Sequence, residues 1–467
     1  MLGAMGVRRR VGWFVLLLGV AGAIVAAVLV ATRGTASGTK TRWGKAIEVP
    51  GVAALEHGGQ SQIDSLSCAR AGNCTANGEY RADATSKGFV AKENGGVWGP
   101  AVPRDDTNGD YHGVLVALKK SHLDHGGGSV GAIVCAKPGF CVAGGSYGDG
   151  HTGCGLYDEN CTQAFVVNET NGVWGKAVEV AGTARINVGG EASLDTISCW
   201  SVGNCTAVGT YTRDITGFGS QSFLVQEKDG VWGTAVRFPF PVDELDADAN
   251  FSVLALFCDS ARSCTAVGSA EFADVRVSVF VASETNGVWG KAIPPPGLEP
   301  LEDGANGATI GFLTCTTARF CTAGGEYEVG VTDDRSLTST GYSEPFLVTE
   351  KNGVWGNAFT PPDFDDLNTG RAASLFSLVC PAADACVAGG SYTDDRREQR
   401  AFVVTETKGV WNRAIEVPGL HALDVGRSDS GSDAQVDDLF CVAVGSCIAG
   451  GYYTDRAGRQ HAFVTAP

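Results

Sequence analysis

The chain has 467 residues, with Lys+Arg 35 against Asp+Glu 52 and a formal net charge of −17. Such an acidic chain repels the phosphate backbone of nucleic acids, which argues against DNA or RNA as a partner. The hydrophobic fraction of 44% is ordinary for a globular protein and too high for a disordered one.

The N-terminus carries a long apolar segment. No charged residue lies between Val11 and Thr32, and Arg8–Arg10 precede the segment. At about 1.5 Å per residue, it would cross a hydrocarbon core of about 30 Å as one helix. It is longer than the apolar region of a secretory signal, so we expect a transmembrane signal anchor over 11–32, with a basic cytoplasmic segment 1–10 and a linker 33–42. The alternative is a protein secreted after cleavage near Ala36.

The remainder of the chain is a repeat array. A Glu-x-x-Gly-Val-Trp block recurs at Glu93–Trp98, Glu169–Trp174, Glu227–Trp232, Glu284–Trp289, Glu350–Trp355 and Glu406–Trp411. A Phe lies nine residues before each of these Trp residues. Each unit is predicted to hold four short strands: one before a first Cys, one after a second Cys, one around the Phe and one from the Trp onward.

The repeat predicts a closed all-β architecture. Four antiparallel strands per unit at this period are typical of a β-propeller blade, so we expect a seven-bladed β-propeller over 43–467. The chain enters at a fourth strand, at Trp43, and ends after a third strand, at Phe463. The N-terminal strand is therefore expected to close the last blade and leave no open sheet edge in the ring.

The cysteines follow the same rhythm. Seven pairs have five residues between partners: Cys68/Cys74, Cys135/Cys141, Cys199/Cys205, Cys258/Cys264, Cys315/Cys321, Cys380/Cys386 and Cys441/Cys447. We expect each to be a disulfide between the first and second strands of its blade, since zinc pairs are spaced more closely. Cys154 and Cys161 are the two that remain, and are expected to pair with each other. This cysteine usage places the propeller on the extracytoplasmic side of the cell membrane.

Two resemblances follow from these residues. The stretch Cys386-Val-Ala-Gly-Gly-Ser-Tyr392, followed by Trp411, resembles the kelch repeat, although paired cysteines are not a kelch feature. The units with Trp-Gly-x-Ala-x-Glu-Val-Pro-Gly also resemble uncharacterised secreted or membrane-anchored propeller-repeat proteins of high-GC bacteria. The resemblance implies an extracellular location.

The binding site is expected in long connections, because variable loops on a rigid ring usually carry binding. The connections from Pro103 to Ser129 and from Tyr147 to Thr162 are long and hold four of the seven His. The candidate ligand-binding residues are Tyr111, His112, His122, Asp124, His125 and His151. A metal set made of His122, Asp124, His125 and His151 is one interpretation, and a solvated polar loop is the other.

Two acidic stretches resemble the start of calcium loops, with alternate oxygen ligands at Asp246, Asp248 and Asn250 and at Asp363, Asp365 and Asp366. Both lack the glycine and the distant Glu of such loops, so solvated loop charge is favoured and no cofactor is predicted.

The favoured function is a non-enzymatic, membrane-anchored extracellular module that binds a glycan, a peptide or a partner protein. No nucleophile elbow, zinc-protease motif, phosphate loop or dinucleotide fingerprint is present. The alternatives are an extracellular enzyme, either a copper oxidase of the galactose-oxidase type or a glycan hydrolase or lyase, and a purely structural surface module.

Overall fold

The structure is a computed structural model of the chain. It describes residues 43–465 except 57–59, 83–84, 104–109, 124–126, 155–158, 215–218, 240–249, 272–276, 299–306, 330–341 and 425–432. The predicted anchor and linker therefore lie outside the described residues. Within these described ranges, no helix is both long enough and apolar enough to span a bilayer.

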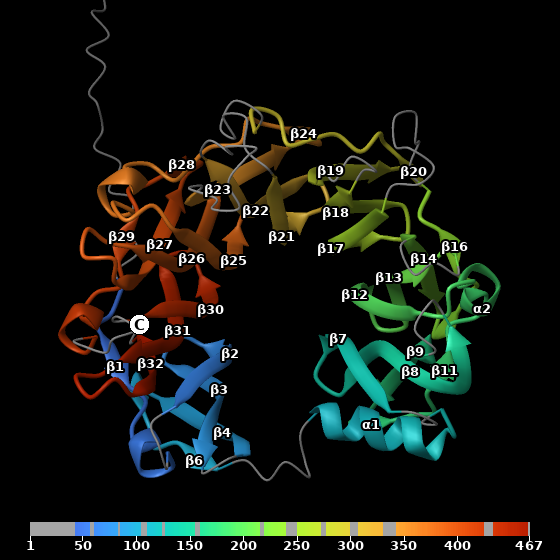
Figure 1. Cartoon of the computed structure of the whole chain (residues 1–467), viewed down its shortest axis with the longest axis horizontal. Helices are drawn as coiled ribbons and strands as arrows, with labels where there is room; N and C mark the ends of the chain where they lie inside the picture. Colours follow the sequence, from blue (N-terminus) through green and yellow to red (C-terminus); the bar gives the residue numbers. More distant parts are fainter. Residues whose placement is uncertain are drawn as a thin grey trace, which may run out of the picture. The chain divides into compact units, whose positions relative to one another are not determined.

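The described strands form seven antiparallel sheets, numbered here 1 to 7 from the first strand β2 (Figure 1). The first strands of sheets 1 to 7 lie nearest the centre of the unit and are β2 (Ser61–Arg70), β7 (Gly128–Lys137), β12 (Ala192–Ser201), β17 (Asn250–Ser260), β21 (Ala308–Thr317), β25 (Ala373–Ala382) and β30 (Gln435–Ala443). The second strands are β3 (Asn73–Ala82), β8 (Phe140–Cys154), β13 (Asn204–Thr212), β18 (Ser263–Glu271), β22 (Phe320–Val329), β26 (Ala385–Thr393) and β31 (Ser446–Thr454). The third strands, which carry the repeated Phe, are β4 (Thr85–Asn94), β9 (Glu159–Thr170), β14 (Ser220–Lys228), β19 (Val277–Thr285), β23 (Tyr342–Lys351), β27 (Gln399–Thr407) and β32 (Gln460–Thr465).

The predicted fourth strand is present only as short pieces that pair with the third strand. The Val-Trp pieces are β5 (Val97–Trp98), β10 (Val173–Trp174), β15 (Val231–Trp232), β20 (Val288–Trp289), β24 (Val354–Trp355) and β28 (Val410–Trp411). A second piece follows in four sheets: β6 (Val102–Pro103), β11 (Val178–Glu179), β16 (Val236–Arg237) and β29 (Ile415–Glu416). The residue that follows each of these Trp residues, Gly in five sheets and Asn412 in sheet 6, donates its amide back to the third strand, as Gly99 N does to Lys92 O at 2.8 Å. This contact separates the two pieces.

The ends of the chain meet in sheet 7, as predicted. Strand β1 (Ala46–Glu48) pairs antiparallel with β32, with Ile47 opposite Val464. Trp98 of sheet 1 donates its indole N–H to the carbonyl of Thr465 at 3.4 Å, which ties the last described residue to the next sheet. The first and last strands thus share one set of ladder bonds.

The seven predicted hairpin disulfides are present, as in Cys68–Cys74 and Cys199–Cys205, where the cysteines are direct partners across the first two strands with Cα atoms 3.9 and 4.0 Å apart. The others join Cys135–Cys141, Cys258–Cys264, Cys315–Cys321, Cys380–Cys386 and Cys441–Cys447. Cys161 is also disulfide-bonded. Its pairing with Cys154, whose side chain is not described, stays a prediction. The Cys turn and the Asn-Gly turn of a sheet lie side by side, since Gly172 N donates to Gly139 O at 3.1 Å.

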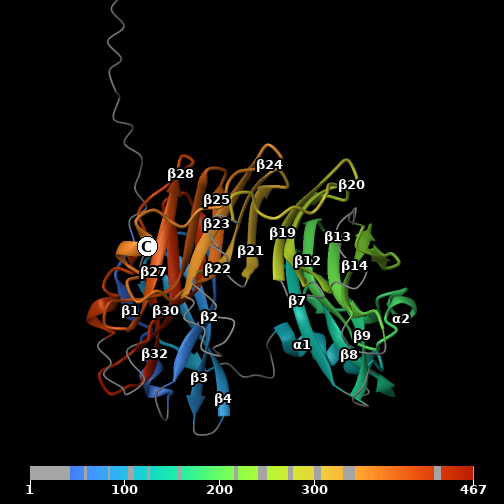
Figure 2. The same ribbon diagram turned by 45° about the horizontal axis from the view of Figure 1, so that its top comes forward.

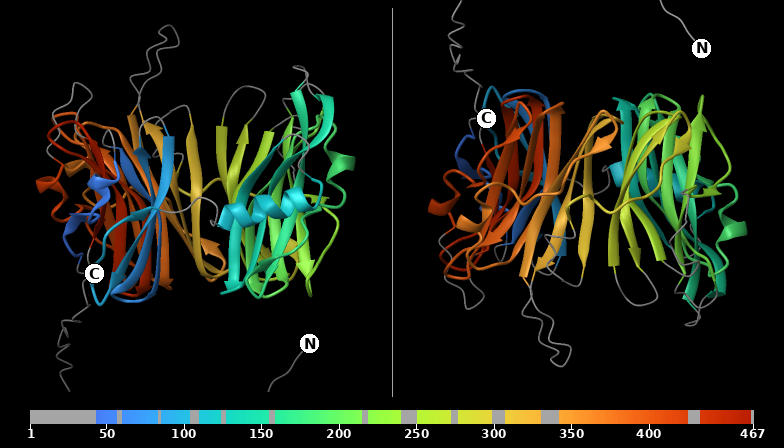
Figure 3. Two further views of the ribbon diagram at one scale, coloured as in Figure 1. Left: turned by 90° about the horizontal axis from the view of Figure 1, so that it is seen from below. Right: turned by 90° about the horizontal axis from the view of Figure 1, so that it is seen from above.

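Apolar side chains pack each sheet face to face against the next from sheet 2 around to sheet 7, and sheet 7 packs against sheet 1. Figures 2 and 3 show these sheets side by side with their strands running between the two faces of the unit. Such radial packing of four-stranded sheets is the arrangement of a β-propeller.

The contact between sheets 1 and 2 differs from the others. Helix α1 (Asp110–Lys120) lies against the face of sheet 2 that would otherwise meet sheet 1, in the interval between these sheets (Figure 1). Val114, Ala117 and Leu118 are at most 3% exposed and pack on Phe165 and Ala177 of sheet 2. Their i, i+3, i+4 spacing gives the helix one apolar face. The helix thus takes the place of a neighbouring sheet.

Sheet 1 correspondingly has an open polar face toward sheet 2. Its Val90 is only half-buried, whereas the residues at the same position in the other sheets are at most 9% exposed: Val166, Leu224, Val281, Leu347, Val403 and Val464. Asn77 stands where sheets 3 and 4 have the fully buried Val208 and Val267. A polar side chain at this position needs solvent or a hydrogen-bond partner, so the sequence itself keeps this face from closing.

We expect Leu118→Ala to lower the free energy of unfolding by about 2–5 kcal/mol, because it opens a cavity under the helix. Leu118 is 1% exposed, whereas Leu115 on the same helix is half-buried. Leu115→Ala is the matched control and should cost clearly less in urea denaturation. Equal effects of the two substitutions would contradict the packing role given to α1.

Candidate functional site

The structure brings together few of the residues predicted to bind a ligand. Tyr111 and His112 lie in α1 and not in a loop, and their side chains are not described. His122 follows the helix with φ 59°, and His151 is exposed, with Nδ1 3.2 Å from Asp149. Asp124 and His125 lie outside the described residues. In the part of the chain that the structure describes, no group of three or more His, Cys, Asp or Glu is arranged to hold a metal ion.

The acidic stretch at 363–366 has a local role. Asp363 adopts φ 55° before a 3-10 helix, η3 (Phe364–Asp366), and the Asp366 carboxylate lies 3.1 Å from Arg413. Asn250 begins β17 and accepts the amide of Ser220 at 2.9 Å. Asp246 and Asp248 lie outside the described residues.

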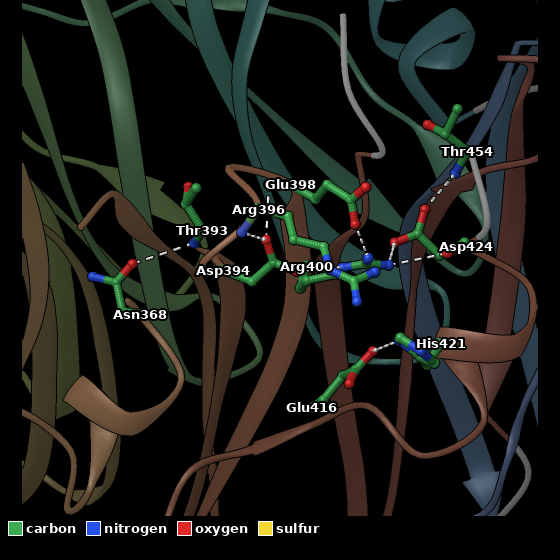
Figure 4. Close-up of polar contacts among 10 residues, drawn as sticks. All are labelled: Asn368, Thr393, Asp394, Arg396, Glu398, Arg400, Glu416, His421, Asp424 and Thr454. Atoms are coloured by element: carbon green, nitrogen blue, oxygen red, sulfur yellow. Dashed lines mark hydrogen bonds and ion pairs between the residues drawn. The ribbon is translucent and has the colours of Figure 1, made fainter. Parts of the chain in front are cut away.

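A buried charge cluster surrounds Arg400 on β27 (Figure 4). Its guanidinium donates to the side chain of Asp424 at 2.6 Å, to Asp394 at 3.3 Å and to Glu398. Asp424 follows the 3-10 helix η4 (Leu420–Ala422), so the cluster ties the connection after sheet 6 to the third strand of that sheet. Arg400 lies two residues before Phe402, and the same position is used in other sheets: Glu344 accepts a bond from Asn368 at 2.9 Å, and His461 contacts Glu56 at 2.9 Å. A contact repeated from sheet to sheet holds the architecture and does not mark a unique active site.

The Glu before each Gly-Val-Trp also has a structural position. Glu93, Glu227, Glu284, Glu350 and Glu406 are at most 7% exposed. Burial raises the pKa of each of these carboxyls, that of Glu284 to about 7. Glu350, for example, accepts a hydrogen bond from Ser283 of the preceding sheet at 2.6 Å. Glu227 likewise accepts a bond from Asn168 of the preceding sheet, so these two carboxyls help to join neighbouring sheets.

Each first strand carries a β-bulge. The bulged residue directly follows the residue that pairs with a glycine of the second strand. The bulged residues are Asp64, Gly131, Asp195, Leu254, Gly311, Phe376 and Asp437. The glycine is required because the strand-one carbonyl approaches it closely: a Cβ on Gly78 would lie 2.1 Å from Gln62 O, and one on Gly451 2.0 Å from Gln435 O. A bulged residue is released from the sheet ladder, and here it belongs to the innermost strand, so it is presented to the centre of the unit.

Two of the bulged carboxyls, Asp64 and Asp437, come from the adjacent sheets 1 and 7 and form the candidate site, called here the carboxylate pair. Burial raises the pKa of Asp437 to about 7; a hydrogen bond from Gln435 opposes the rise, and the charges of Asp64 and Asp438 add to it. Burial also raises the pKa of Asp64, a bond from Gln62 at 2.9 Å opposes it, and Glu79 adds to it. The third bulged aspartate, Asp195 in sheet 3, is held instead by Thr210 at 2.8 Å.

A pocket of ≈ 410 Å³ opens on the polar face of sheet 1. Its lining is Gln60, Ser61, Gln62, Glu79, Tyr80, Arg81, Ser86 and Gln460. Gln62 and Glu79 connect the pocket to Asp64, since both act on its carboxyl. Polar linings of this kind suit ligands with many hydroxyl groups, and sequence reasoning missed the site because it looked only at long loops.

The Asp438 carboxyl next to the pair has a structural role. It accepts the amide of Leu66 at 2.8 Å and the hydroxyl of Ser377 at 3.2 Å, which links sheets 1, 6 and 7. Its oxygens are therefore engaged, whereas one oxygen of Asp437, Oδ2, has no hydrogen-bond partner within the protein.

Comparisons with known proteins gave similar folds and no sequence relatives. No family model matches the chain, and the search of curated proteins returned no relative. A polysaccharide lyase of the ulvan lyase type, bound to -[GlcA(1-4)Rha3S]-, is similar with TM-score 0.41 and 9% identity over 91% of this chain and 94% of that chain. The α-L-arabinofuranosidase of Fusarium graminearum with arabinobiose has TM-score 0.35 and 9% identity over 71% and 90%. A Hadza microbial sialidase has TM-score 0.39 and 12% identity over 84% and 73%.

These findings correct two predictions. The favoured non-enzymatic binding module, and the expectation that the chain is not an enzyme, are contradicted, because these similar structures are of enzymes named for glycan substrates. The kelch resemblance gains no support, since no family model matches. At 9–12% identity and TM-scores below 0.5, the similarities transfer no residue role to this chain.

Proposed function

We propose that the protein cleaves glycosidic bonds, with the carboxylate pair as its acid and base. The observation that carries the proposal is an interacting pair of carboxyls from neighbouring sheets, Asp437 with a pKa near 7 and Asp64. Asp64 in turn interacts with Gln62 and Glu79, which line a polar pocket of ≈ 410 Å³. Glycan cleavage commonly uses two carboxyls whose environments separate their pKa values, one protonated and one ionised.

The roles follow from the two environments. Asp437 holds its proton to the higher pH and donates it to the glycosidic oxygen as the C–O bond breaks. Asp64 accepts a proton from the water that attacks the sugar carbon, or it attacks that carbon itself and forms a glycosyl ester that water then cleaves. Glu79, which adjoins Asp64, holds negative charge beside a developing oxocarbenium ion. In a lyase, the second carboxyl would instead remove a carbon-bound proton and leave an unsaturated sugar.

We expect Asp437→Asn and Asp64→Asn each to reduce kcat by about 10²–10⁴-fold, the usual contribution of a general acid or base. The assay uses the full-length chain in detergent with a panel of polysaccharides, and it measures new reducing ends together with unsaturated products. Asp195→Asn is the matched control, because it changes the equivalent bulged aspartate of sheet 3. Full activity of both pair variants, or equal loss with Asp195→Asn, would remove the proposed site.

Activity should also fall as the pH rises through about 7, because Asp437 then loses the proton that it must donate. Gln435 donates a hydrogen bond to Asp437 and so favours its ionised form. Gln435→Met should therefore move the alkaline limb of the kcat profile to higher pH. If the alkaline limb stays at the same pH in this variant, a group other than Asp437 controls the fall in kcat.

We further propose that the seven sheets are the seven blades of one propeller carried outside the cytoplasmic membrane. The support is the β1–β32 pairing, the hairpin disulfides, which persist in oxidising compartments, and the apolar segment 11–32. An extracellular glycan fits this location, and cleavage near Ala36 is the alternative to a membrane anchor.

A further inference from the structure

The two ends of the chain are held together by a buried histidine between two carboxylates. His461 on β32 is 4% exposed. Its Nδ1 lies 2.9 Å from Glu56 and its Nε2 lies 3.2 Å from Asp455. Glu56 belongs to the N-terminal segment after β1, just beyond the 3-10 helix η1 (Val52–Ala54), and its side chain is 1% exposed.

Both ring nitrogens face carboxylate oxygens, and this geometry fixes the charge of the histidine. A neutral imidazole carries one N–H, so its other nitrogen would point a lone pair at a carboxylate. Only the imidazolium presents an N–H, and a positive charge, to both Glu56 and Asp455. Contact with the Glu56 carboxylate and its charge, the hydrogen bond with Asp455 and the charge of Glu48 on β1 raise the pKa of His461, against the opposing effect of burial.

The other groups around the histidine are already engaged. Arg459 donates to Asp455 at 2.6 Å, and Tyr453, whose ring centroid lies 5.6 Å from that of His461, donates its hydroxyl to Glu48 at 2.8 Å. Ser61 donates to Glu56 and accepts the amide of Ala462 at 2.8 Å. Loss of the proton from His461 would therefore leave Glu56 buried without its cation, which is costly.

Sheet 6 provides the contrast within the same chain. There the position of His461 is taken by Arg400, and that of Glu56 by Asp424. A guanidinium stays charged at every pH at which a protein is folded, so the contact in sheet 6 does not titrate near neutrality. Of these two contacts, only the one in sheet 7 has a cation that titrates near neutral pH.

We propose that His461, Glu56 and Asp455 form a pH-sensitive latch that holds the N-terminal segment 46–56 onto the last strand when the histidine is protonated and loosens it when the proton is lost. The inference is independent of the proposed function. Because Ser61 and Gln460 both line the pocket on sheet 1, loosening of the latch would also change the pocket wall.

Hydrogen exchange of the full-length protein, followed by mass spectrometry, tests the latch. The readout is the protection of residues 46–56 relative to residues 415–424, which hold the equivalent contact in sheet 6 and cancel the intrinsic pH dependence of exchange. Between pH 5.5 and pH 8.5 this ratio should fall by about tenfold or more in the wild type, because the stabilisation linked to the protonated histidine is lost as the pH rises through its raised pKa.

Two variants complete the experiment. His461→Gln should give a low ratio that no longer depends on pH, and Arg400→His should transfer the pH dependence to residues 415–424. A wild-type ratio that is constant over this pH range would overturn the proposal, as would pH dependence that persists in His461→Gln. If His461→Gln fails to fold, the wild-type ratio and the Arg400→His variant still decide the matter.

Discussion

Replacing Arg400 by Met is expected to lower the free energy of unfolding by about 3–5 kcal/mol, the range found when one partner of a buried ion pair is removed. The guanidinium is 5% exposed and contacts Asp424, Asp394 and Glu398, and the side chain of Asp424 is itself 1% exposed. Met keeps most of the apolar stem, so the loss comes from carboxylates left without a cation. Urea denaturation at neutral pH measures it.

The matched control is Arg413→Met. Arg413 and Asp366 are 3.1 Å apart, but their side chains are 55% and 65% exposed. Solvent screens such a pair, so this substitution should cost at most about 1 kcal/mol. A loss at Arg400 no greater than that at Arg413 would contradict the structural role assigned to the cluster. Arg400→Lys, which keeps the charge but not the fork of donors, should fall between the two.

The repeated part of the structure could be predicted from the sequence because each unit states the same pattern again. The Phe strand and the hairpin disulfides were each supported by six or more copies, and Trp43 and Phe463 placed the two ends of the repeat array in one sheet. The fourth strand was predicted too long, since the amide of the residue after each Trp bonds back to the third strand and interrupts the fourth.

The candidate site could not be found in this way, because it depends on departures from the repeat. Asp64 and Asp437 interrupt the alternation of their strands, and a glycine four residues after the second Cys, as at Gly78 and Gly451, accompanies each bulge. That glycine was the available signal. Asp64 and Asp437 come together only because sheet 7 packs on sheet 1, and no local sequence pattern predicts that contact.

Helix α1 was missed for a related reason. Its apolar positions, Val114, Ala117 and Leu118, form a single short stripe inside a connection that occurs once, and the connection read as a loop rich in His. Only the three-dimensional structure shows that this stripe fills the place of a neighbouring sheet. The polar residues of sheet 1, such as Asn77 and Lys92, gave the complementary signal that this face is not packed.

The stability of the protein is expected to fall as the pH rises from about 4.5 to 7. Burial raises the pKa of Glu284 and of Glu344 to about 7, in each case from 4.5. Below 4.5 these carboxyls are protonated in both the folded and the unfolded chain, and their contribution to stability is complete. Above 4.5 the unfolded chain releases protons that the folded protein retains, so folding is disfavoured until the pH passes the folded pKa. At about 1.4 kcal/mol per pKa unit, this rise corresponds to about 3.5 kcal/mol, and screening by solvent reduces it to roughly 2–3 kcal/mol for each carboxyl. Thermal unfolding at a series of pH values should show Tm decreasing steadily over this range.

The slope can be assigned to these groups with isosteric substitutions. Glu284→Gln and Glu344→Gln each remove one titrating carboxyl, and each should flatten the decrease in Tm by removing about 2–3 kcal/mol of its amplitude. These two side chains are 7% and 5% exposed, whereas Glu328 is exposed on β22, so Glu328→Gln is the control and should leave the slope unchanged. The lowered pKa of Asp455, caused mainly by its bonds with Arg459 against the opposing effect of burial, acts only at more acidic pH and does not oppose this trend. If Tm rises toward pH 7, or if the two Gln variants retain the full slope, the buried glutamates are ionised in the folded protein and must have partners other than those described here.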